Sequence, residues 1–280
     1  MRAWWRRLRL GLPTVTGLGA GGFFIPYRHA AGTRATDYPA LRPLFQTAAP
    51  KFSEVLAVIE EFAPDLLRIA AGSGPARFDQ DWFPRLDAAA AYALVRRHKP
   101  ARIVEIGSGH STRFLARAVA DGGLETKITC IDPAPRAAIA GLPVRHIRAL
   151  LQDAGDAVFT ELASGDVLFV DSSHVAMPGT DVDRLFLDVV PRLPVGIFLH
   201  VHDVTLPDAY PEIWSWRGYN EQLLVGALLQ GGAFTPIFAS HFVKTTGPLP
   251  EVVQRLPLQS GAFETSLWLR KMAAPVLRQP

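Results

Sequence analysis

The distribution of hydrophobic positions divides the chain into an irregular first part and a regular second part. Residues 1 to about 45 show no sustained period and contain four prolines, which predicts an irregular arm packed on the rest of the protein. From Phe52 to Phe62, apolar residues recur every three or four positions, and another short repeat follows Pro64; both predict helices. We therefore expect an N-terminal arm and helical extension over residues 1–80 and one larger domain over residues 81–280.

The second part alternates between short apolar runs and helix-like intervals. One helix is predicted near Pro84 to His98 and a longer one from about Ile213 to Gln230. The apolar runs that predict strands lie at 103–106, 127–132, 144–150, 166–171, 195–203, 234–240 and 263–270. This spacing is typical of βαβ units, so we predict an α/β fold built on a doubly wound, mostly parallel seven-stranded sheet.

The first predicted strand leads into a glycine-rich turn. Gly107 and Gly109 remove side chains that would keep a ligand from the backbone, and Ser111 is placed to cap the next helix, whose first N–H groups would face the ligand. The third glycine of a dinucleotide fingerprint is replaced by Thr112. The carboxylate of Glu105 would also repel a pyrophosphate, so we expect a ligand that carries an ammonium group.

Composition and charge exclude several kinds of partner. The net charge is +3, but four arginines lie within the first ten residues, and the body of the chain has no basic and aromatic stripe for nucleic acid. The single cysteine, Cys130, fits a reducing, cytoplasmic location. No apolar run is long enough to span a bilayer. Tryptophans beside the N-terminal arginines allow a weak contact with a membrane surface, although packing on the domain is the favoured interpretation.

Acidic residues lie at or near the carboxyl ends of four of the predicted strands, at Glu105, Asp132, Asp171 and Asp203. Ligands of an open parallel sheet bind beyond the carboxyl ends of its strands. Asp171 and Asp203 follow adjoining strands and should share one cleft, where two close carboxylates favour a cation between them. Oxygen ligands favour Mg²⁺ or another divalent cation.

These motifs resemble a known family. The pattern E-x-G-x-G formed by Glu105, Gly107 and Gly109 resembles motif I of the class I S-adenosylmethionine-dependent methyltransferases. Asp171, followed three residues later by His174 and by an acid after the next strand, resembles the metal-dependent O-methyltransferases of the macrocin type. The resemblance covers about residues 81–271 and implies a Rossmann-like fold whose last strand is antiparallel.

The resemblance also implies a function and a set of site residues. The expected reaction transfers a methyl group from S-adenosylmethionine to a small-molecule hydroxyl, such as that of a sugar. Asp132 would accept the ribose hydroxyls and Gln152 would lie near adenine. The full set expected to bind the cofactor is Glu105, Gly107, Ser108, Gly109, Ser111, Asp132 and Gln152. 

Three residues, Asp171, His202 and Asp203, would hold the divalent cation. Asp171 and His174 are the expected catalytic residues. An unperturbed histidine has a pKa of about 6.5, so His174 is expected to be neutral and to act as general base.

Alternatives remain open. The run H-x-H-D at 200–203 is similar to the ligand runs of metal-dependent hydrolases, although His200 alone is better explained as a core histidine. A non-catalytic partner protein with the same fold is a further option, and so is a homo-oligomer. The aromatic residues after the fifth strand would form either a substrate lid or part of the core; they are Tyr210, Trp214, Trp216 and Tyr219.

Overall fold

The structure of the protein is a computed structural model that describes residues 2–19 and 21–274. The chain forms two compact units. The smaller contains the residues up to Thr36 together with Tyr210–Gly218, and the larger contains Asp37–Ala209 together with the residues from Tyr219 onward.

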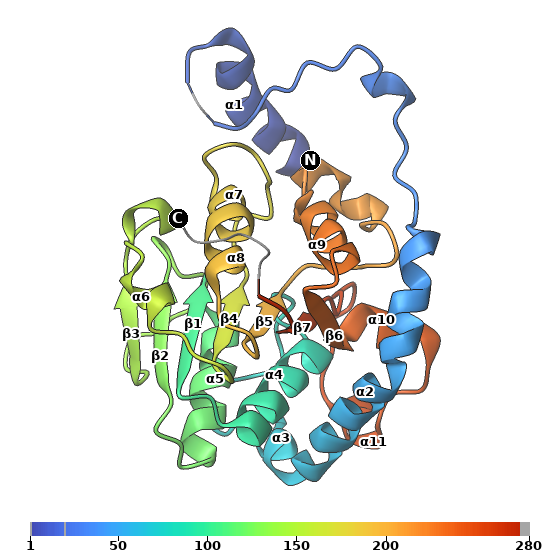
Figure 1. Ribbon diagram of the computed structural model, residues 1–280. Helices are drawn as coiled ribbons and strands as arrows, with labels where there is room; N and C mark the ends of the chain where they lie inside the picture. The colour runs from blue at the N-terminus through green and yellow to red at the C-terminus, as the bar shows by residue number, and fades with distance from the viewer. Residues whose placement is uncertain (1, 20, 275–280) are drawn as a thin grey trace. The chain divides into compact units, whose positions relative to one another are not determined.

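The larger unit is built on a seven-stranded sheet, shown in Figure 1 with helices around it. Its strands are β1 (Arg102–Ile106), β2 (Lys127–Ile131), β3 (Val144–Ile147), β4 (Val167–Val170), β5 (Phe198–Val201), β6 (Phe234–Ala239) and β7 (Leu267–Lys271). Their order is β3-β2-β1-β4-β5-β7-β6, and β7 runs antiparallel to both of its neighbours. The predicted doubly wound sheet with one antiparallel strand is confirmed.

The register of the sheet brings the predicted site residues to one edge. Ile106, the last residue of β1, lies opposite Ile131 of β2 and Val170 of β4, and Val170 lies opposite Val201 of β5. The residues that follow these strands therefore leave the sheet at the same level. From β1 the sheet is extended on one side by β2 and β3 and on the other side by β4 and β5, so the strand order reverses at β1. Ligands of open α/β sheets bind at such a switch point.

Helices and short turns connect the strands. The longer helices of the larger unit are α2 (Arg42–Glu61), α3 (Ala63–Ala70), α4 (Arg85–His98), α5 (His110–Asp121) and α9 (Glu221–Gln230). The shorter ones are α6 (Ala157–Thr160), α7 (Asp181–Arg184), α8 (Val190–Arg192), α10 (Ser240–Thr246) and α11 (Glu251–Arg255), with the π-helical turn η4 (Leu185–Val189) between α7 and α8 and the 3₁₀ turns η2 (Pro39–Leu41) and η3 (Leu151–Asp153).

Helix α2 belongs to the core of the larger unit. It packs against α4 and β6, and the rings of Phe52 and Phe242 lie 5.9 Å apart. Phe45, Phe52 and Ile59 are buried. The sequence analysis placed this helix in an N-terminal extension that ends at residue 80, whereas the compact unit begins at Asp37, because the apolar face of α2 is covered by the sheet and its helices.

The smaller unit contains α1 (Arg2–Thr16) and the 3₁₀ turns η1 (Ala30–Gly32) and η5 (Glu212–Arg217). The prediction of an irregular arm is therefore wrong for residues 2–16. Pro13 lies inside α1, within its last four residues, and does not end the helix there. Within the residues that the structure describes, no helix is long and apolar enough to cross a membrane.

Candidate functional site

The glycine turn after β1 brings two strand ends close together. Gly107 has φ of 80°, and a Cβ atom there would lie 1.9 Å from the carbonyl oxygen of Asp171, so only glycine fits. A Cβ atom at Gly109 would lie 3.2 Å from the backbone nitrogen of Ala137. Close backbone contacts within the chain therefore account for both glycines.

The prediction that Ser111 caps the helix after this turn is wrong. Helix α5 begins at His110, and the hydroxyl of Thr112 accepts a hydrogen bond from the N–H of Gly109 at 2.9 Å, so Ser111 is not the N-cap residue. The carboxylate of Glu105 accepts hydrogen bonds from Ser111 Oγ and Thr112 Oγ1, both at 2.6 Å, and is fully buried. This carboxylate therefore faces the first turn of α5, and the role of Glu105 in cofactor binding stays a prediction.

The environment of Glu105 changes its ionisation. Burial raises the pKa of this carboxyl to about 7, although hydrogen bonds from Ser111, Thr112 and Cys130 oppose the increase. The carboxyl group that is bonded to the first turn of α5, next to the glycine turn, is thus partly protonated at neutral pH.

Asp132 connects the end of β2 to the glycine turn. Its Oδ2 accepts hydrogen bonds from the N–H of Ser108 at 2.7 Å and from Ser108 Oγ at 3.0 Å, and its Oδ1 accepts one from the N–H of Ala134 at 2.7 Å. Gln152 is exposed in η3 and donates to the carbonyl of Gly179 at 2.9 Å. The roles of both residues in cofactor binding stay predictions.

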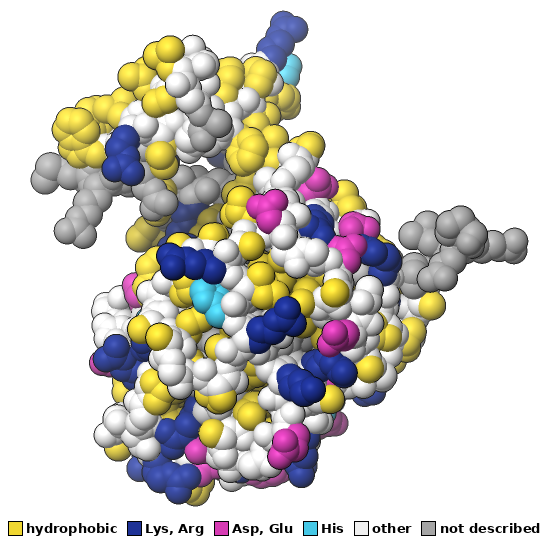
Figure 2. Space-filling model, turned by 90° about the vertical axis from the view of Figure 1, so that its left-hand side faces the viewer, with side chains coloured by type: hydrophobic (Ala, Val, Ile, Leu, Met, Phe, Trp, Pro, Cys, Tyr) yellow, Lys and Arg dark blue, Asp and Glu magenta, His cyan; other side chains and the backbone are white. Residues whose placement is uncertain are grey.

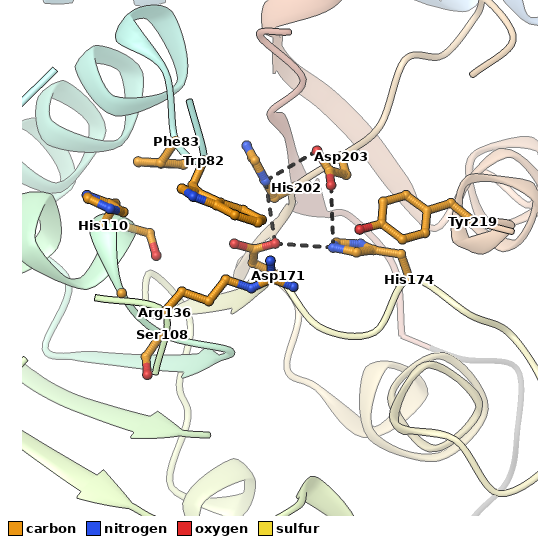
Figure 3. Close-up of a pocket in the computed structure, with 12 residues that line it drawn as sticks. Trp82, Phe83, Ser108, His110, Arg136, Asp171, His174, His202, Asp203 and Tyr219 are labelled. Carbon is orange, nitrogen blue, oxygen red and sulfur yellow. Dashed lines mark ion pairs between the residues drawn. The ribbon is translucent and has the colours of Figure 1, made fainter. Parts of the chain in front are cut away.

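Four side chains, here called the Asp–His quartet, meet beyond β4 and β5 (Figure 3). They are Asp171, His174, His202 and Asp203. His174 Nε2 lies 3.3 Å from Asp171 Oδ1 and 3.6 Å from Asp203 Oδ2. His202 Nδ1 lies 3.5 Å from Asp171 Oδ1 and 3.7 Å from Asp203 Oδ1. Each aspartate thus faces both histidines, and the structure brings together the residues predicted for catalysis and metal binding.

Each histidine of the quartet has a second ring nitrogen that faces away from the aspartates, and one buried carboxylate contacts each of these nitrogens. Glu221, at the start of α9, lies 2.9 Å from His174 Nδ1, and Asp87, in the first turn of α4, lies 3.2 Å from His202 Nε2. Asp87 also accepts hydrogen bonds from the N–H groups of Thr265 and Ser266. Sequence reasoning missed both acids. The only available signal was a lone acid ahead of the alanine run in α4.

The quartet compensates its charges internally. Burial alone would lower the pKa of both histidines, but contacts with Asp171, Asp203 and the outer carboxylates raise each pKa well above its ordinary value. Burial would likewise raise the pKa of Asp171, yet the charge of His202 and the contact with His174 hold it low. These contacts favour the protonated form of both histidines in the chain without a cation, so a neutral His174 that acts as general base stays a prediction.

The backbone is strained at two members of the quartet. His174 has φ of 59° and Asp203 has φ of 56°, in a region that residues other than glycine rarely occupy. Such strain persists only where the surrounding structure imposes it and is concentrated at functional sites. Both residues are therefore held in place by the backbone as well as by their charged neighbours.

The quartet lines a pocket together with the glycine turn and three aromatic residues. Trp82, Phe83 and Tyr219 contribute the aromatic surface, and Tyr219 lies with its ring centroid 4.5 Å from that of His174. The guanidinium of Arg136 lies 4.2 Å from the centroid of Trp82. Trp82 and Arg136 both line this pocket, whose cavity of about 30 Å³ has room for about one water molecule.

His200 lies outside this pocket, in the buried strand β5. Its Nε2 lies 2.8 Å from Ser266 Oγ, and its ring centroid lies 3.9 Å from that of Phe169. Burial and the charge of His202 lower its pKa well below the ordinary value. His200 therefore lies in the core and does not face the quartet. The H-x-H run then supplies only one histidine to the site, which removes the main argument for a metal-dependent hydrolase.

The donor set of the quartet fits a divalent cation in its chemistry. His202 Nδ1 is buried without a hydrogen-bond partner and faces both aspartates, and carboxylates commonly hold the outer nitrogen of metal-bound histidines. Over residues 2–19 and 21–274, however, no three His, Cys, Asp or Glu side chains form a group that could hold a metal ion. The side chains would have to move inward before a cation could bind.

Residues 104–204 match the family model of a methyltransferase domain. The match begins in β1 and ends just after Asp203, so it includes the glycine turn and the whole quartet. This part of the chain is therefore similar to a methyltransferase domain. No curated protein matches the sequence.

Solved methyltransferases share low identity with the chain. The methyltransferase PaMTH1 of Podospora anserina, solved with SAH, is 16% identical over 90% of this chain and 100% of its own, with a TM-score of 0.43. The plantazolicin methyltransferase BpumL, with SAH and a desmethyl analogue, is 14% identical over 81% of this chain and 100% of its own, with a TM-score of 0.44. MycE, from mycinamycin biosynthesis, solved with Mg, SAH and mycinamycin VI, is 18% identical over 75% of this chain and 54% of its own, with a TM-score of 0.43.

The site extends beyond the range that matches the family model. Asp87, Trp82 and Glu221 lie outside residues 104–204, yet they support or close the pocket. The site is thus assembled from the matched range and from helices on both sides of it in the sequence.

Proposed function

We propose that this methyltransferase domain transfers a methyl group from S-adenosylmethionine to a hydroxyl oxygen of a small molecule. The observation that carries the proposal is the Asp–His quartet, which lies beside the glycine turn at the switch point of the sheet. The solved methyltransferases named above were determined with SAH, and the O-linked chemistry rests on the resemblance of the quartet to that of macrocin-type enzymes.

In the proposed reaction, the acceptor oxygen forms a bond to the methyl carbon while the bond from that carbon to sulfur breaks. The electron pair of the broken bond goes to sulfur, and the hydroxyl proton goes to Nε2 of His174. Glu221 holds the other ring nitrogen at 2.9 Å and so aims Nε2 at the cleft. Correct placement of the oxygen in line with the methyl group provides much of the acceleration.

A cation fits the same chemistry. Asp171, His202 and Asp203 would hold a divalent cation, whose positive charge would favour the ionised acceptor and the neutral form of His174. Asp171 and Asp203 also lie 3.3 and 3.6 Å from Nε2 of His174, where they would orient its ring.

The test measures binding and turnover separately. Titration calorimetry should show that SAH binds to the purified chain and that NAD does not. Methyl transfer from labelled S-adenosylmethionine is then followed with a panel of sugars and phenols, with and without a chelator. Binding of NAD without binding of SAH would overturn the methyltransferase assignment, whereas activity that survives metal removal would reject only the cation.

His174→Gln tests the base. Turnover should fall about 10²–10⁴-fold at saturating substrates, while the affinity for SAH stays within about twofold, because a general base acts on the chemical step. The matched control is His241→Gln, since His241 also pairs with one carboxylate, Asp208 Oδ2 at 2.9 Å, but lies outside the pocket. Equal turnover in the two variants would remove His174 from the mechanism.

A further inference from the structure

Helix α1 of the smaller unit has a hydrophobic face that is turned to solvent. Successive residues of an α-helix are rotated by about 100°, so residues spaced by three, four, seven or eight positions share a side. The apolar side chains on that side are all exposed, at 58% for Trp4, 63% for Trp5, 39% for Leu8, 61% for Leu12 and 59% for Val15. Packing of this arm on the domain, the interpretation favoured from the sequence, stays a prediction.

The opposite side of α1 is already covered by the chain that follows it. The N–H of Leu18 donates to the carbonyl of Pro13 at 2.9 Å, and the N–H of Gly21 donates to Thr14 Oγ1 at 3.0 Å. A Cβ atom at Gly21 would lie 2.8 Å from the carbonyl oxygen of Leu10, so the returning chain lies directly on the helix. The helix and its return segment therefore close on each other and leave the hydrophobic face outside.

The return segment extends the exposed hydrophobic surface. Phe23, Phe24, Ile25 and Tyr27 are each between 56% and 61% exposed. Figure 2 shows hydrophobic side chains over much of the visible face of the smaller unit. We call these residues together with the exposed face of α1 the apolar surface. A contiguous surface of this kind marks an interaction site.

The charge of the segment identifies the kind of partner. Residues 1–36 contain six arginines and no acidic residue, whereas the rest of the chain has more acidic than basic residues. Arg7 and Arg9 are exposed on α1, outside the apolar face. Arg7 also lines a groove of about 380 Å³ within the smaller unit, together with Leu10, Phe24 and Arg217. Arginines beside tryptophans and leucines suit a surface that offers phosphate groups above a hydrocarbon layer.

We propose that the smaller unit binds the surface of an anionic phospholipid bilayer. The apolar surface enters the boundary between headgroups and acyl chains, and the arginines contact lipid phosphates. The helix lies along the membrane plane and does not cross it, in agreement with the lack of a spanning helix among the described residues. The proposal is independent of the reaction proposed above.

The experiment uses the full chain and sedimentation with vesicles. Vesicles of phosphatidylcholine mixed with phosphatidylglycerol should sediment the protein, and vesicles of phosphatidylcholine alone should sediment at least about tenfold less. Higher salt should release the protein, because counterions screen the attraction. Equal binding to both vesicle types, or no binding to either, would overturn the proposal.

Two pairs of variants locate the contact. Trp5→Ser with Leu12→Ser should weaken partition into anionic vesicles by more than about tenfold, whereas Leu187→Ser with Leu223→Ser, which removes exposed apolar residues of the larger unit, should leave it unchanged. Arg7→Gln with Arg9→Gln should weaken it by roughly tenfold or more, compared with Arg145→Gln and Arg148→Gln as exposed controls.

Other occupants of the apolar surface give distinct results. If it joins two copies of the chain, light scattering will show a dimer that Trp5→Ser with Leu12→Ser dissociates, and the vesicles will not sediment the protein; that result would overturn the proposal. Circular dichroism should show equal helix content in all variants, because the substituted side chains are exposed.

Discussion

Glu105→Gln should change how the stability of the larger unit depends on pH. Glu105 is fully buried beneath the glycine turn, and burial raises its pKa from 4.5 to about 7. Between these pH values the folded chain keeps a proton that the unfolded chain releases. The free energy of unfolding contributed by this group therefore decreases as the pH rises from about 4.5 to 7 and is constant above that range.

The size of the effect follows from the pKa. Each unit of pKa corresponds to about 1.4 kcal/mol, so ionisation of Glu105 should destabilise the folded chain by about 3.5 kcal/mol well above pH 7. Glutamine cannot ionise, and its amide can still bond to the hydroxyls of Ser111 and Thr112. Relative to the wild type, Glu105→Gln should therefore gain about 2 to 3 kcal/mol between pH 5 and pH 8.

Urea unfolding followed by circular dichroism at pH 5 and pH 8 measures this difference. Subtracting the wild type removes the contributions of the other titrating groups. Glu125→Gln is the matched control, because Glu125 is exposed and its substitution should give the same small difference at both pH values. A difference between Glu105→Gln and the wild type that does not change with pH would refute the reasoning.

Two further substitutions test the turn itself. Gly107→Ala should lower the free energy of unfolding, measured in urea, by about 2 to 5 kcal/mol, because its Cβ would meet the carbonyl of Asp171. Gly141 is the control, since it has a similar φ of 84° and no atom within 4 Å of a Cβ built there. Equal losses of stability in Gly107→Ala and Gly141→Ala would argue against the clash. Asp132→Ala should weaken SAH binding at least about tenfold in calorimetry, because Ser108 loses its acceptor; unchanged affinity would exclude Asp132 from the cofactor site.

The sheet could be predicted because its signal is local. Short apolar runs separated by helical intervals predict the number of strands. The acids at the ends of these runs predict that Asp171 and Asp203 are neighbours, and the pairing of β4 with β5 agrees. The role of Glu105 could not be predicted in this way. Motif and spacing place it before the glycines, but only the packing of α5 shows that its carboxylate faces inward.

The outer support of the quartet depends on long-range contacts. Asp87 meets His202 across 115 positions, and Glu221 meets His174 across 47, so no periodicity in the sequence connects them. The protonation state of His174 could not be predicted from the sequence either, because its pKa depends on carboxylates that only the fold brings near it. Helix α1 was missed for a different reason, since Pro13 and the neighbouring glycines were given too much weight as helix breakers.

The contact between Trp82 and Arg136 has a consequence for the kinetics of ligand binding. Both side chains line the pocket, whose cavity of about 30 Å³ is too small for a nucleotide-sized ligand, so we expect such a ligand to bind only after they have moved apart. Association then requires an opening step that the ligand does not accelerate. In stopped-flow experiments, the observed binding rate should level off at high ligand concentration, at the rate of opening, and Arg136→Ala should raise that limit.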